Sequence, residues 1–353
     1  MLDHKTAKQG GRARPRVTTM EEFSAASGIS RPTVSRYFSD PESVRAETRE
    51  RIEGALKQLR YSPNLFATNF NRKNSKTFGV IVPVLSDPFY SGLVERVEWR
   101  ALQEGYWTIV LTSHGERTME SRAIEILMSL KVAGAIVAPL GVSPDLSLVR
   151  ELRGAVPLVL LDSRVDREAS FIGTNNFQSV ALMIDYLHRT GEAPCFFDMP
   201  SVNRNAIERR EAYVASMKKL GSEPLVIAAP SQSWAFEAIG YEQACNYFSI
   251  NPLPRRTILC ATDRGAFGVL AAANERGIRV SRTGQEGEIR VAGHDDHPLS
   301  RYASPSLTTV AQDSAEMANL AISMLISKRD EKRPKRVRDV HLLEAKLIMR
   351  NSA

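Results

Sequence analysis

The sequence is poor in cysteine, and the spacing of its few cysteines argues against disulfides and metal sites. Only Cys195, Cys245 and Cys260 occur in 353 residues, an odd number without C-x-x-C spacing. This pattern is typical of reduced, partly buried thiols in a cytosolic protein and unlike the framework of a disulfide-rich secreted domain. We therefore expect reduced cysteines and no metal site.

The sequence also lacks a membrane segment and the common motifs of catalysis. No stretch approaches the roughly 20 apolar residues that span a bilayer. The N-terminus has no apolar core of a secretory signal. G-x-S-x-G, Walker A and G-x-G-x-x-G are all missing, so nothing indicates a hydrolase, an ATPase or a dinucleotide enzyme. These absences predict a cytoplasmic protein with no cofactor and disfavour an enzyme.

Excess positive charge is absent from most of the chain and confined to its N-terminal end. Residues 1–76 carry 15 Lys or Arg and 8 Asp or Glu, whereas the remainder carries 32 of each. A basic excess in one segment predicts a polyanionic partner for that segment alone. The polar residues 1–16, with three arginines, are predicted to be a disordered basic arm.

Three short helices are predicted after this arm, near residues 20–27, 31–38 and 45–59. Thr19 and Glu22 form a capping box at the first helix start, and Gly28 suits the left-handed residue that ends this helix. Ser30 and Pro32 favour the start of the second helix. Two helices joined by such a turn indicate a helix-turn-helix, whose second helix enters the major groove of DNA.

The third helix has an apolar stripe that needs the other two helices to be buried. Residues 17–62 are therefore predicted to form one DNA-binding domain. Residues 63–76 form a polar linker that nevertheless carries Leu65, Phe66 and Phe70. Because a plain spacer rarely needs aromatic side chains, we expect this linker to fold only against a partner.

From residue 77 onward the pattern alternates between buried strands and amphipathic helices. Gly79–Leu85 is a continuous apolar run, which is typical of a strand buried on both faces. About ten strands alternate with helices in this way, which predicts parallel βαβ units. This number favours two α/β subdomains over one sheet. Ligands of such folds bind beyond the carboxyl ends of the strands, which here means the cleft between the subdomains.

Several sequence motifs occur along the chain in a fixed order. They are T-x-x-E-F-x-x-x-x-G-I-S-x-x-T-V-S-R (Thr19–Arg36), E-T-R-E-R-I (Glu47–Ile52), Y-x-P-N-x-x-A (Tyr61–Ala67), G-V-I-V-P…S-D-P-F-Y (Gly79–Tyr90), A-T-D (Ala261–Asp263), G-H-D-D (Gly293–Asp296) and P-S-L-T-T-V-x-Q (Pro305–Gln312). In this order and at this spacing the chain resembles the LacI/GalR transcription regulators over about residues 17–350.

The resemblance implies a small all-α helix-turn-helix domain, a hinge helix at 63–76 and an α/β core at 77–353. This core is periplasmic-binding-protein-like, with two parallel-sheet subdomains. The N-terminal subdomain is expected to hold about residues 77–175 and 308–335, and the C-terminal subdomain about 176–305 and 338–353. The last strand, about Val340–Met349, is thus expected to return to the second subdomain. A homodimer on a near-palindromic operator is also implied.

The resemblance places the DNA contacts on the headpiece and the hinge. Arg31 and Arg36 fall where the recognition helix faces base edges, and an arginine can form a bidentate pair with guanine. Phe70 takes the place of a Leu that wedges into the central operator step; its packing on the core is the alternative. Thr19 and Ser30 have a purely structural alternative as helix caps. The predicted DNA-binding set is Thr19, Ser30, Arg31, Pro32, Thr33, Ser35, Arg36, Asn64, Ala67 and Phe70.

In the core the resemblance implies a site for a small polar effector, most often a sugar. Carboxylates, amides and an arginine suit hydroxyl groups, and an indole ring suits the apolar face of a sugar. The predicted effector-binding set is Asp87, Phe89, Asp162, Asn205, Arg209, Trp234, Thr262 and Asp295. Asp87 and Thr262 stand where Asn is commoner in the family, so the sequence leaves the effector unidentified.

These features predict a sequence-specific DNA-binding regulator, a repressor controlled by a carbohydrate-like effector. A periplasmic sugar-binding protein shares the core but would lack residues 17–76. An enzyme would need a nucleophile, a base or a cofactor loop. His294–His297 is no metal or catalytic cluster, because neighbouring residues on a strand point to opposite faces. The sequence leaves open the operator, the sign of the effector's action and the choice of dimer or tetramer.

Overall fold

The computed structural model divides the chain into two units, Met1–Ser75 and Lys76–Ala353. It describes residues 17–39, 41–61, 75–141, 144–229, 233–285, 287–330 and 339–353. The predicted basic arm and the predicted hinge helix, with Asn64, Ala67 and Phe70, lie outside the described residues. Each unit is described by itself.

The N-terminal unit is a small helical domain around an apolar core. Its elements are α1 (Met20–Ser27), α2 (Arg31–Ser39), the 3-10 turn η1 (Pro41–Ser43) and α3 (Ala46–Leu59). The predicted capping box is confirmed, with Glu22 N donating to Thr19 Oγ1 at 3.2 Å and Thr19 N donating to Glu22 Oε2 at 3.1 Å. Gly28 ends α1 with φ 67°, a left-handed conformation that glycine adopts without a steric penalty. Phe23 and Tyr61 stack at the centre of this core.

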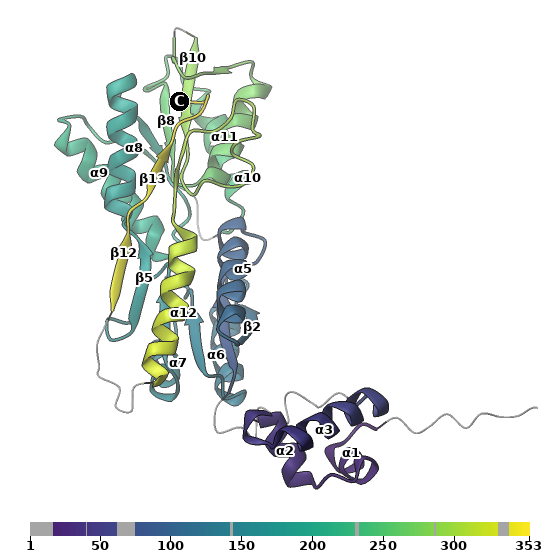
Figure 1. Ribbon diagram of the computed structural model, residues 1–353. Helices are drawn as coiled ribbons and strands as arrows, with labels where there is room; N and C mark the ends of the chain where they lie inside the picture. Colours follow the sequence, from purple (N-terminus) through teal and green to yellow (C-terminus); the bar gives the residue numbers. More distant parts are fainter. Residues whose placement is uncertain are drawn as a thin grey trace, which may run out of the picture. The chain divides into compact units, whose positions relative to one another are not determined.

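The first lobe of the larger unit is a parallel six-stranded sheet with helices on both faces (Figure 1). The strands run in the order β12-β5-β4-β3-β1-β2. Their bounds are β1 Thr77–Val82, β2 Trp107–Thr112, β3 Gly134–Val137, β4 Leu158–Leu161, β5 Ser170–Thr174 and β12 Val340–Leu343. The covering helices are α5 (Pro88–Gln103), α6 (Arg117–Ser129), α7 (Leu146–Ala155) and α12 (Ser314–Asp330). Helices α5 and α12 pack together, and one apolar cluster joins them to the sheet, while α6 and α7 contribute to another cluster.

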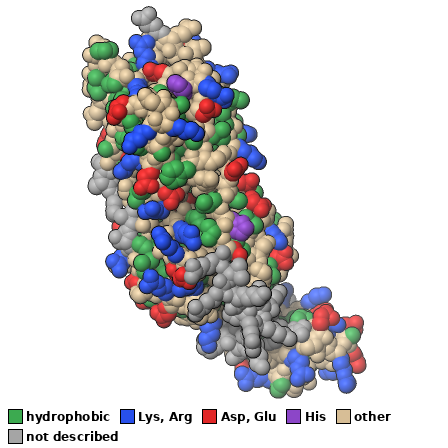
Figure 2. Space-filling model, turned by 90° about the vertical axis from the view of Figure 1, so that its left-hand side faces the viewer, with side chains coloured by type: hydrophobic (Ala, Val, Ile, Leu, Met, Phe, Trp, Pro, Cys, Tyr) green, Lys and Arg blue, Asp and Glu red, His purple; other side chains and the backbone are tan. Residues whose placement is uncertain are grey.

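The second lobe repeats this plan with a five-stranded parallel sheet in the order β7-β6-β8-β10-β9. Its strands are β6 Cys195–Phe197, β7 Val226–Ile227, β8 Thr257–Cys260, β9 Arg279–Val280 and β10 Glu288–Ala292. Its helices are α8 (Asn176–Thr190), α9 (Arg204–Lys219), α10 (Phe236–Tyr247) and α11 (Asp263–Glu275). The predicted α/β core of two parallel-sheet subdomains is thus confirmed. The face that includes α8, α9, β5 and β12 carries basic and acidic side chains interspersed over both lobes (Figure 2).

The prediction that the whole last strand returns to the second lobe is wrong for Val340–Leu343. These residues form β12, which pairs in parallel with β5 at the edge of the first sheet. This pairing satisfies main-chain groups of β5 that a direct return to the second lobe would leave unpaired. Only β13 (Lys346–Ile348) returns, where it pairs antiparallel with β11 (Thr309–Ala311).

The prediction that the chain returns to the first lobe at residue 308 is also wrong, because the return occurs later in the sequence. Thr308 bridges to Ala292 and Ala311 bridges to Asp295, so residues 308–311 lie with the second sheet rather than the first. The chain therefore crosses to the first lobe only at α12. Three elements of the first lobe, α7, β5 and α12, were not predicted. The strand β5 is a short segment that contains Ser, Gly and Thr beside only two apolar residues.

Candidate DNA-binding surface and effector cleft

The second helix of the headpiece presents one face to its own core and another to solvent. Val34 is fully buried in the headpiece core, whereas Arg31, Pro32 and Arg36 are exposed. Thr33 and Ser35 are intermediate. The α2 residues predicted to contact DNA therefore avoid the buried stripe, as a recognition helix requires.

Two members of the predicted DNA set have structural roles at helix ends. The hydroxyl of Thr19 caps α1. Ser30 precedes α2 and its hydroxyl lies 2.8 Å from that of Thr33. In addition, Arg31 Nε lies 2.9 Å from Glu21 Oε1 of α1, with both side chains more than half exposed. Such a surface pair contributes about 0–1 kcal/mol, so a base or a phosphate can replace it.

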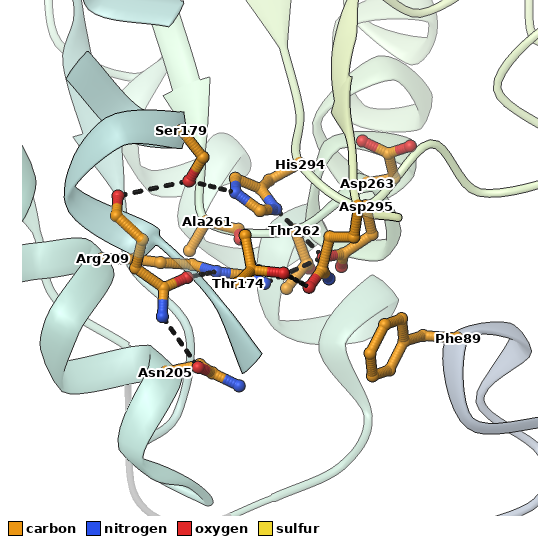
Figure 3. A network of polar contacts seen from close by, with 12 residues as sticks. Phe89, Thr174, Ser179, Asn205, Arg209, Ala261, Thr262, Asp263, His294 and Asp295 are labelled. Atoms are coloured by element: carbon orange, nitrogen blue, oxygen red, sulfur yellow. Dashed lines mark hydrogen bonds and ion pairs between the residues drawn. The ribbon is translucent and has the colours of Figure 1, made fainter. Parts of the chain in front are cut away.

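A polar network fills the cleft between the two lobes of the core (Figure 3). Asp162, at the end of β4, accepts hydrogen bonds from Tyr90 Oη at 2.7 Å and from Asn205 Nδ2 at 2.5 Å. Tyr90 belongs to the first lobe and Asn205 to the start of α9 in the second, so this carboxylate joins the lobes. Burial raises the pKa of Asp162 to about 6 against the opposing hydrogen bonds from Tyr90 and Asn205 and the charge of Arg209.

Arg209 organises the second-lobe side of this network. Its Nη2 donates to Asp295 Oδ1 at 2.9 Å, its Nη1 donates to the Ala261 carbonyl at 2.7 Å, and its Nε donates to Asn176 Oδ1 at 3.2 Å. Asn176 in turn donates to Asn205 Oδ1 at 2.8 Å. The guanidinium is nearly fully buried and held by three acceptors, so its orientation in the cleft is fixed.

Asp295 follows β10 and stays ionised in the cleft. Burial by itself would raise its pKa, but Arg209 and His294 outweigh this effect and hold the pKa below the usual value. His294 Nδ1 lies 3.0 Å from Asp295 Oδ1, and Gln312 Nε2 donates to the same oxygen at 2.8 Å. Burial and the charge of Arg209 lower the pKa of His294 to about 4, so this imidazole is neutral near pH 7. Neutral His294 and charged Asp295 therefore form one acceptor-rich corner.

Asp87 and Phe89 line a cavity of about 140 Å³ on one side of this network, together with Asp295 and Arg264. Asp87 caps α5, accepting from Phe89 N at 2.9 Å. Its Oδ2 accepts from Arg264 Nη1 at 3.1 Å, and this ion pair joins the two lobes. A cavity needs only about 10–15 Å³ of accessible volume to hold one water, so a cavity of about 140 Å³ has room for a small polar molecule.

Arg264 is fixed by its own lobe before it reaches Asp87. Its Nε and Nη2 donate to the two carboxylate oxygens of Glu237, each at 2.7 Å, and Nη2 also donates to the Trp234 carbonyl at 2.9 Å. The guanidinium carbon lies 4.8 Å from the centre of the Phe236 ring. Of the three guanidinium nitrogens of Arg264, Nη1 makes the contact across the cleft, to Asp87. The sequence analysis missed Arg264, since nothing in its neighbourhood signals a cross-lobe contact.

Trp234 and Thr262 are placed differently from the other predicted effector residues. Trp234 packs against apolar residues of both lobes, with its ring 6.3 Å from that of Tyr90. A side chain at Gly115 would come within 2.3 Å of its indole nitrogen, so glycine is required there. Thr262 caps α11, because Oγ1 accepts from Gly265 N at 3.0 Å. Both residues thus have a clear structural role at the cleft.

Asp263 is a further buried carboxylate beside the cleft, which the sequence analysis noticed only as part of a motif. It accepts hydrogen bonds from His297 N at 2.8 Å, Ser300 Oγ at 2.6 Å and Thr309 Oγ1 at 2.5 Å. Burial and the neighbouring charge of Asp295 nevertheless raise its pKa to about 7. The A-T-D motif therefore marks a structural carboxylate behind the cavity.

Two negative findings concern the part of the chain that the structure describes. None of its helices combines the length and the apolar character needed to cross a bilayer. No group of three or more His, Cys, Asp or Glu side chains in these ranges is arranged to hold a metal ion.

Comparison with known proteins identifies the two parts of the chain. Residues 19–64 match the family described as bacterial regulatory proteins, lacI family, and residues 185–353 match a periplasmic binding protein-like domain. The ribose operon repressor of Escherichia coli (strain K12) is 27% identical over 313 residues, which cover 88% of this chain and 92% of that protein. The transcriptional repressor CytR of the same strain is 26% identical over 343 residues, 95% of this chain and 96% of that protein.

Solved structures share the fold. A Lac repressor dimer bound to operator and the anti-inducer ONPF superposes with a TM-score of 0.80 at 24% identity, covering 95% of this chain and 98% of that chain. A LacI family transcriptional regulator from Enterococcus faecium with bound ribose gives a TM-score of 0.66 at 21% identity, covering 78% of this chain and 98% of that one.

Proposed function

We propose that the chain is a repressor of the LacI family whose operator affinity is set by a small carbohydrate-like effector in the interlobe cleft. It carries a lacI-family DNA-binding domain and a periplasmic-binding-protein-like domain. It is a DNA-binding transcription regulator and not an enzyme. The relatives named above are repressors. The observation that carries the effector proposal is the set of oriented donors and acceptors, Asp162, Asn205, Arg209 and Asp295, contributed by both lobes at one place.

The chemistry of this set matches a polyol. The carboxylates of Asp162 and Asp295 accept hydrogen bonds from hydroxyl groups, and Arg209 and Asn205 donate to hydroxyl oxygens. Trp234 supplies an apolar ring at the cleft, and Asp87 and Phe89 line the adjoining cavity. Thr262, at the start of α11, completes the predicted site. A ligand without hydroxyl groups would leave these buried donors and acceptors unpaired. Such a site therefore discriminates strongly between polyols and ligands that lack hydroxyl groups.

Effector binding is coupled to DNA binding through the relative position of the lobes. A ligand that inserts between Asp162 and Asn205 replaces a direct cross-lobe hydrogen bond with contacts of its own. It therefore changes the balance between two lobe arrangements by its differential affinity for them. A typical coupling free energy is about 1–3 kcal/mol. In the proposed mechanism this energy orders or melts the hinge at residues 63–76.

On the DNA side, α2 is proposed to read the major groove through Arg31, Pro32 and Arg36. Thr33 and Ser35, with the N-terminal residues Thr19 and Ser30, are proposed to position the helix on phosphates. The hinge residues Asn64, Ala67 and Phe70 are proposed to contact the minor groove, with Phe70 as a wedge that kinks the operator. Because its proposed partner is operator DNA, the protein is proposed to act in the cytoplasm.

A homodimer is proposed as the binding unit. Trp99 and Leu102 on α5 and Trp107 on the edge strand β2 are exposed apolar side chains of the first lobe, with Trp107 68% exposed. Large exposed aromatic side chains commonly mark protein–protein contacts, and a second copy of the chain is the proposed partner. A twofold dimer matches a twofold operator.

The test measures DNA binding and its response to sugars in one assay. Fluorescence anisotropy of the full chain with inverted repeats from its own genomic neighbourhood, at fixed salt, should show tight binding to one repeat and weak binding to random duplex. A panel of mono- and disaccharides is then added. The proposal fails if no duplex is preferred, or if no carbohydrate changes the affinity for the preferred one.

A further inference from the structure

The cleft has a second opening, which is rich in arginine. A cavity of about 490 Å³ is lined by Arg164 and Arg167 of the first lobe and by Arg204 of the second. Among the described residues that line it, Glu208 is the only carboxylate. Guanidinium groups around one hollow repel one another unless an anion lies between them.

The carboxylate of Glu208 is already engaged within the second lobe. Its Oε2 accepts a hydrogen bond from Asn176 Nδ2 at 2.9 Å, and its Oε1 lies 3.6 Å from Arg204 Nε. Arg204 is also the first residue of α9, a helix of 16 residues. The partial positive charge of this helix N-terminus adds to that of the guanidinium.

The two arginines of the first lobe have no acidic partner in the described ranges. Arg164 Nη2 donates only to the main-chain oxygen of Arg167, at 3.3 Å. Asp166 lies between them in the sequence, but it is buried and its Oδ2 lies 3.1 Å from Arg153 Nε. Among the residues that the structure describes, no carboxylate is therefore paired with Arg164 or Arg167 at this opening.

This opening adjoins the proposed effector site. Arg164 follows Asp162 by two residues, and Arg204 precedes Asn205 directly. Asp162 and Asn205 are buried and hydrogen-bonded to each other across the cleft, whereas both arginines are exposed. A ligand held by the buried pair thus has the arginines beside it, toward solvent.

The opposite opening contains carboxylates as well as basic side chains. The cavity there is lined by Asp87, Asp263, Asp295 and Asp296, with Arg96, Arg264 and His297 as its basic residues. Three of its four carboxylates pair with arginines, Asp87 with Arg264, Asp295 with Arg209 and Asp296 with Arg350. The two ends of the cleft therefore differ in how their charges are paired: carboxylates and arginines neutralise one another here, whereas Arg164 and Arg167 have no carboxylate partner in the described ranges.

We propose that the effector is an anionic sugar derivative whose phosphate or carboxylate group binds between Arg164, Arg167 and Arg204. This proposal rests on the proposed function and narrows its effector class. Arginine suits the role because its planar guanidinium pairs with phosphate and carboxylate oxygens in a bidentate manner. Because both lobes supply arginines, the bound anion draws them together.

The first experiment tests the anion site without knowledge of the effector. Thermal unfolding of the full chain is compared in sodium phosphate and in sodium chloride at equal ionic strength. Phosphate should raise the unfolding midpoint, because a ligand that binds only the folded state stabilises it. The triple variant Arg164→Gln/Arg167→Gln/Arg204→Gln should lose this difference, and Arg150→Gln, an exposed arginine of the same lobe, should keep it. Equal midpoints in the two salts, or an equal phosphate response in the triple variant, overturn the proposal.

The second experiment compares matched sugars by isothermal titration calorimetry. D-ribose is paired with D-ribose 5-phosphate, and D-glucose with D-glucose 6-phosphate and D-gluconate. An anionic member should bind at least about tenfold more tightly than its neutral partner, which corresponds to one charge-assisted contact. The triple variant should remove this preference, so that the anionic and neutral members of each pair bind with equal affinity.

The outcomes separate this inference from the proposed function. Neutral sugars that bind as tightly as their anionic partners and change operator affinity support the function and overturn the inference. Phosphate protection that needs the three arginines, with no sugar of either kind affecting operator binding, supports an anion site and overturns the carbohydrate effector.

Discussion

The ion pair between Asp87 and Arg264 should hold the two lobes together when no effector is bound. Asp87 follows β1 in the first lobe, and Arg264 lies in α11 of the second. The two side chains are only 11% and 14% exposed. Glu237 and the Trp234 carbonyl fix Arg264 beforehand, so little side-chain entropy is lost when Nη1 reaches Asp87.

The expected size of this effect follows from two opposing contributions. A hydrogen bond to a charged group contributes about 1.5–3 kcal/mol. Burial and the charge of Asp295, however, raise the pKa of Asp87 by more than Arg264 lowers it, so desolvation offsets part of the gain. We therefore expect that Asp87→Asn weakens the closed arrangement by about 1 kcal/mol, which is about a fivefold change in the opening equilibrium.

Hydrogen exchange of the full chain measures this opening directly. The main-chain amide of Arg204 donates to Ser163 Oγ across the cleft at 3.3 Å, so it is protected only while the lobes are closed. Peptides containing this amide should exchange about fivefold faster in Asp87→Asn than in the wild type. Asn also caps helices well, so α5 keeps its start.

Asp296→Asn is the matched control. Asp296 lines the same cavity and pairs with an arginine at 2.6 Å, but its partner Arg350 belongs to the same lobe. Its φ of 51° is one that Asn tolerates. This variant should leave the exchange of the Arg204 amide unchanged, and Arg264→Gln should match Asp87→Asn without adding to it. Equal exchange in Asp87→Asn and wild type, or equal acceleration in the control, would refute the reasoning.

Four further predictions concern the hinge, the effector site, the dimer interface and a buried carboxylate. Phe70→Ala should weaken operator binding at least about tenfold in a gel-shift titration and leave sugar binding unchanged; equal operator affinity would contradict the wedge. Arg209→Gln removes a buried guanidinium with three acceptors, so effector affinity should fall more than tenfold by calorimetry while operator binding persists without effector. Trp107→Glu should shift the core from dimer to monomer in analytical ultracentrifugation, and an unchanged sedimentation coefficient would remove β2 from the interface. Because the pKa of Asp263 is raised in the folded state, its protonation contributes fully to the free energy of unfolding below about pH 4, and this contribution is lost as pH rises through about 7. Asp263→Asn should therefore flatten the fall in the free energy of denaturant unfolding over this pH range. An unchanged slope would show that Asp263 is ionised throughout.

Local chemistry made the headpiece predictable. The capping box of Thr19 and Glu22 and the left-handed Gly28 depend on neighbours within a few residues, so the sequence contains the whole interaction. The alternation of buried strands and helices in the core is predictable for the same reason, since it reflects a period along the chain. The weakly patterned strand β5 escaped this reasoning, and the helices α7 and α12 were missed as well.

The cleft was predicted in kind but not in its connections. Asp162, Asn205, Arg209 and Asp295 were named from the resemblance to the LacI/GalR regulators, and the structure brings their side chains together in the cleft. That Asp162 bonds to Asn205, which lies 43 residues away, follows from the approach of two lobes and from no local signal. Arg264 was missed altogether, because its importance arises only when Asp87 lies opposite.

The sequence by itself determined the helix-turn-helix, the basic N-terminal segment and the α/β class of the core, because each is written in short-range spacing and charge. The tertiary structure decided which strand closes the first sheet, which ion pair crosses the cleft and how charge differs between its two openings. These features depend on groups far apart in the chain that meet only when the chain passes repeatedly between two lobes. The strength of these contacts depends on the distance between the groups and on their burial, and neither can be obtained from the order of residues in the chain.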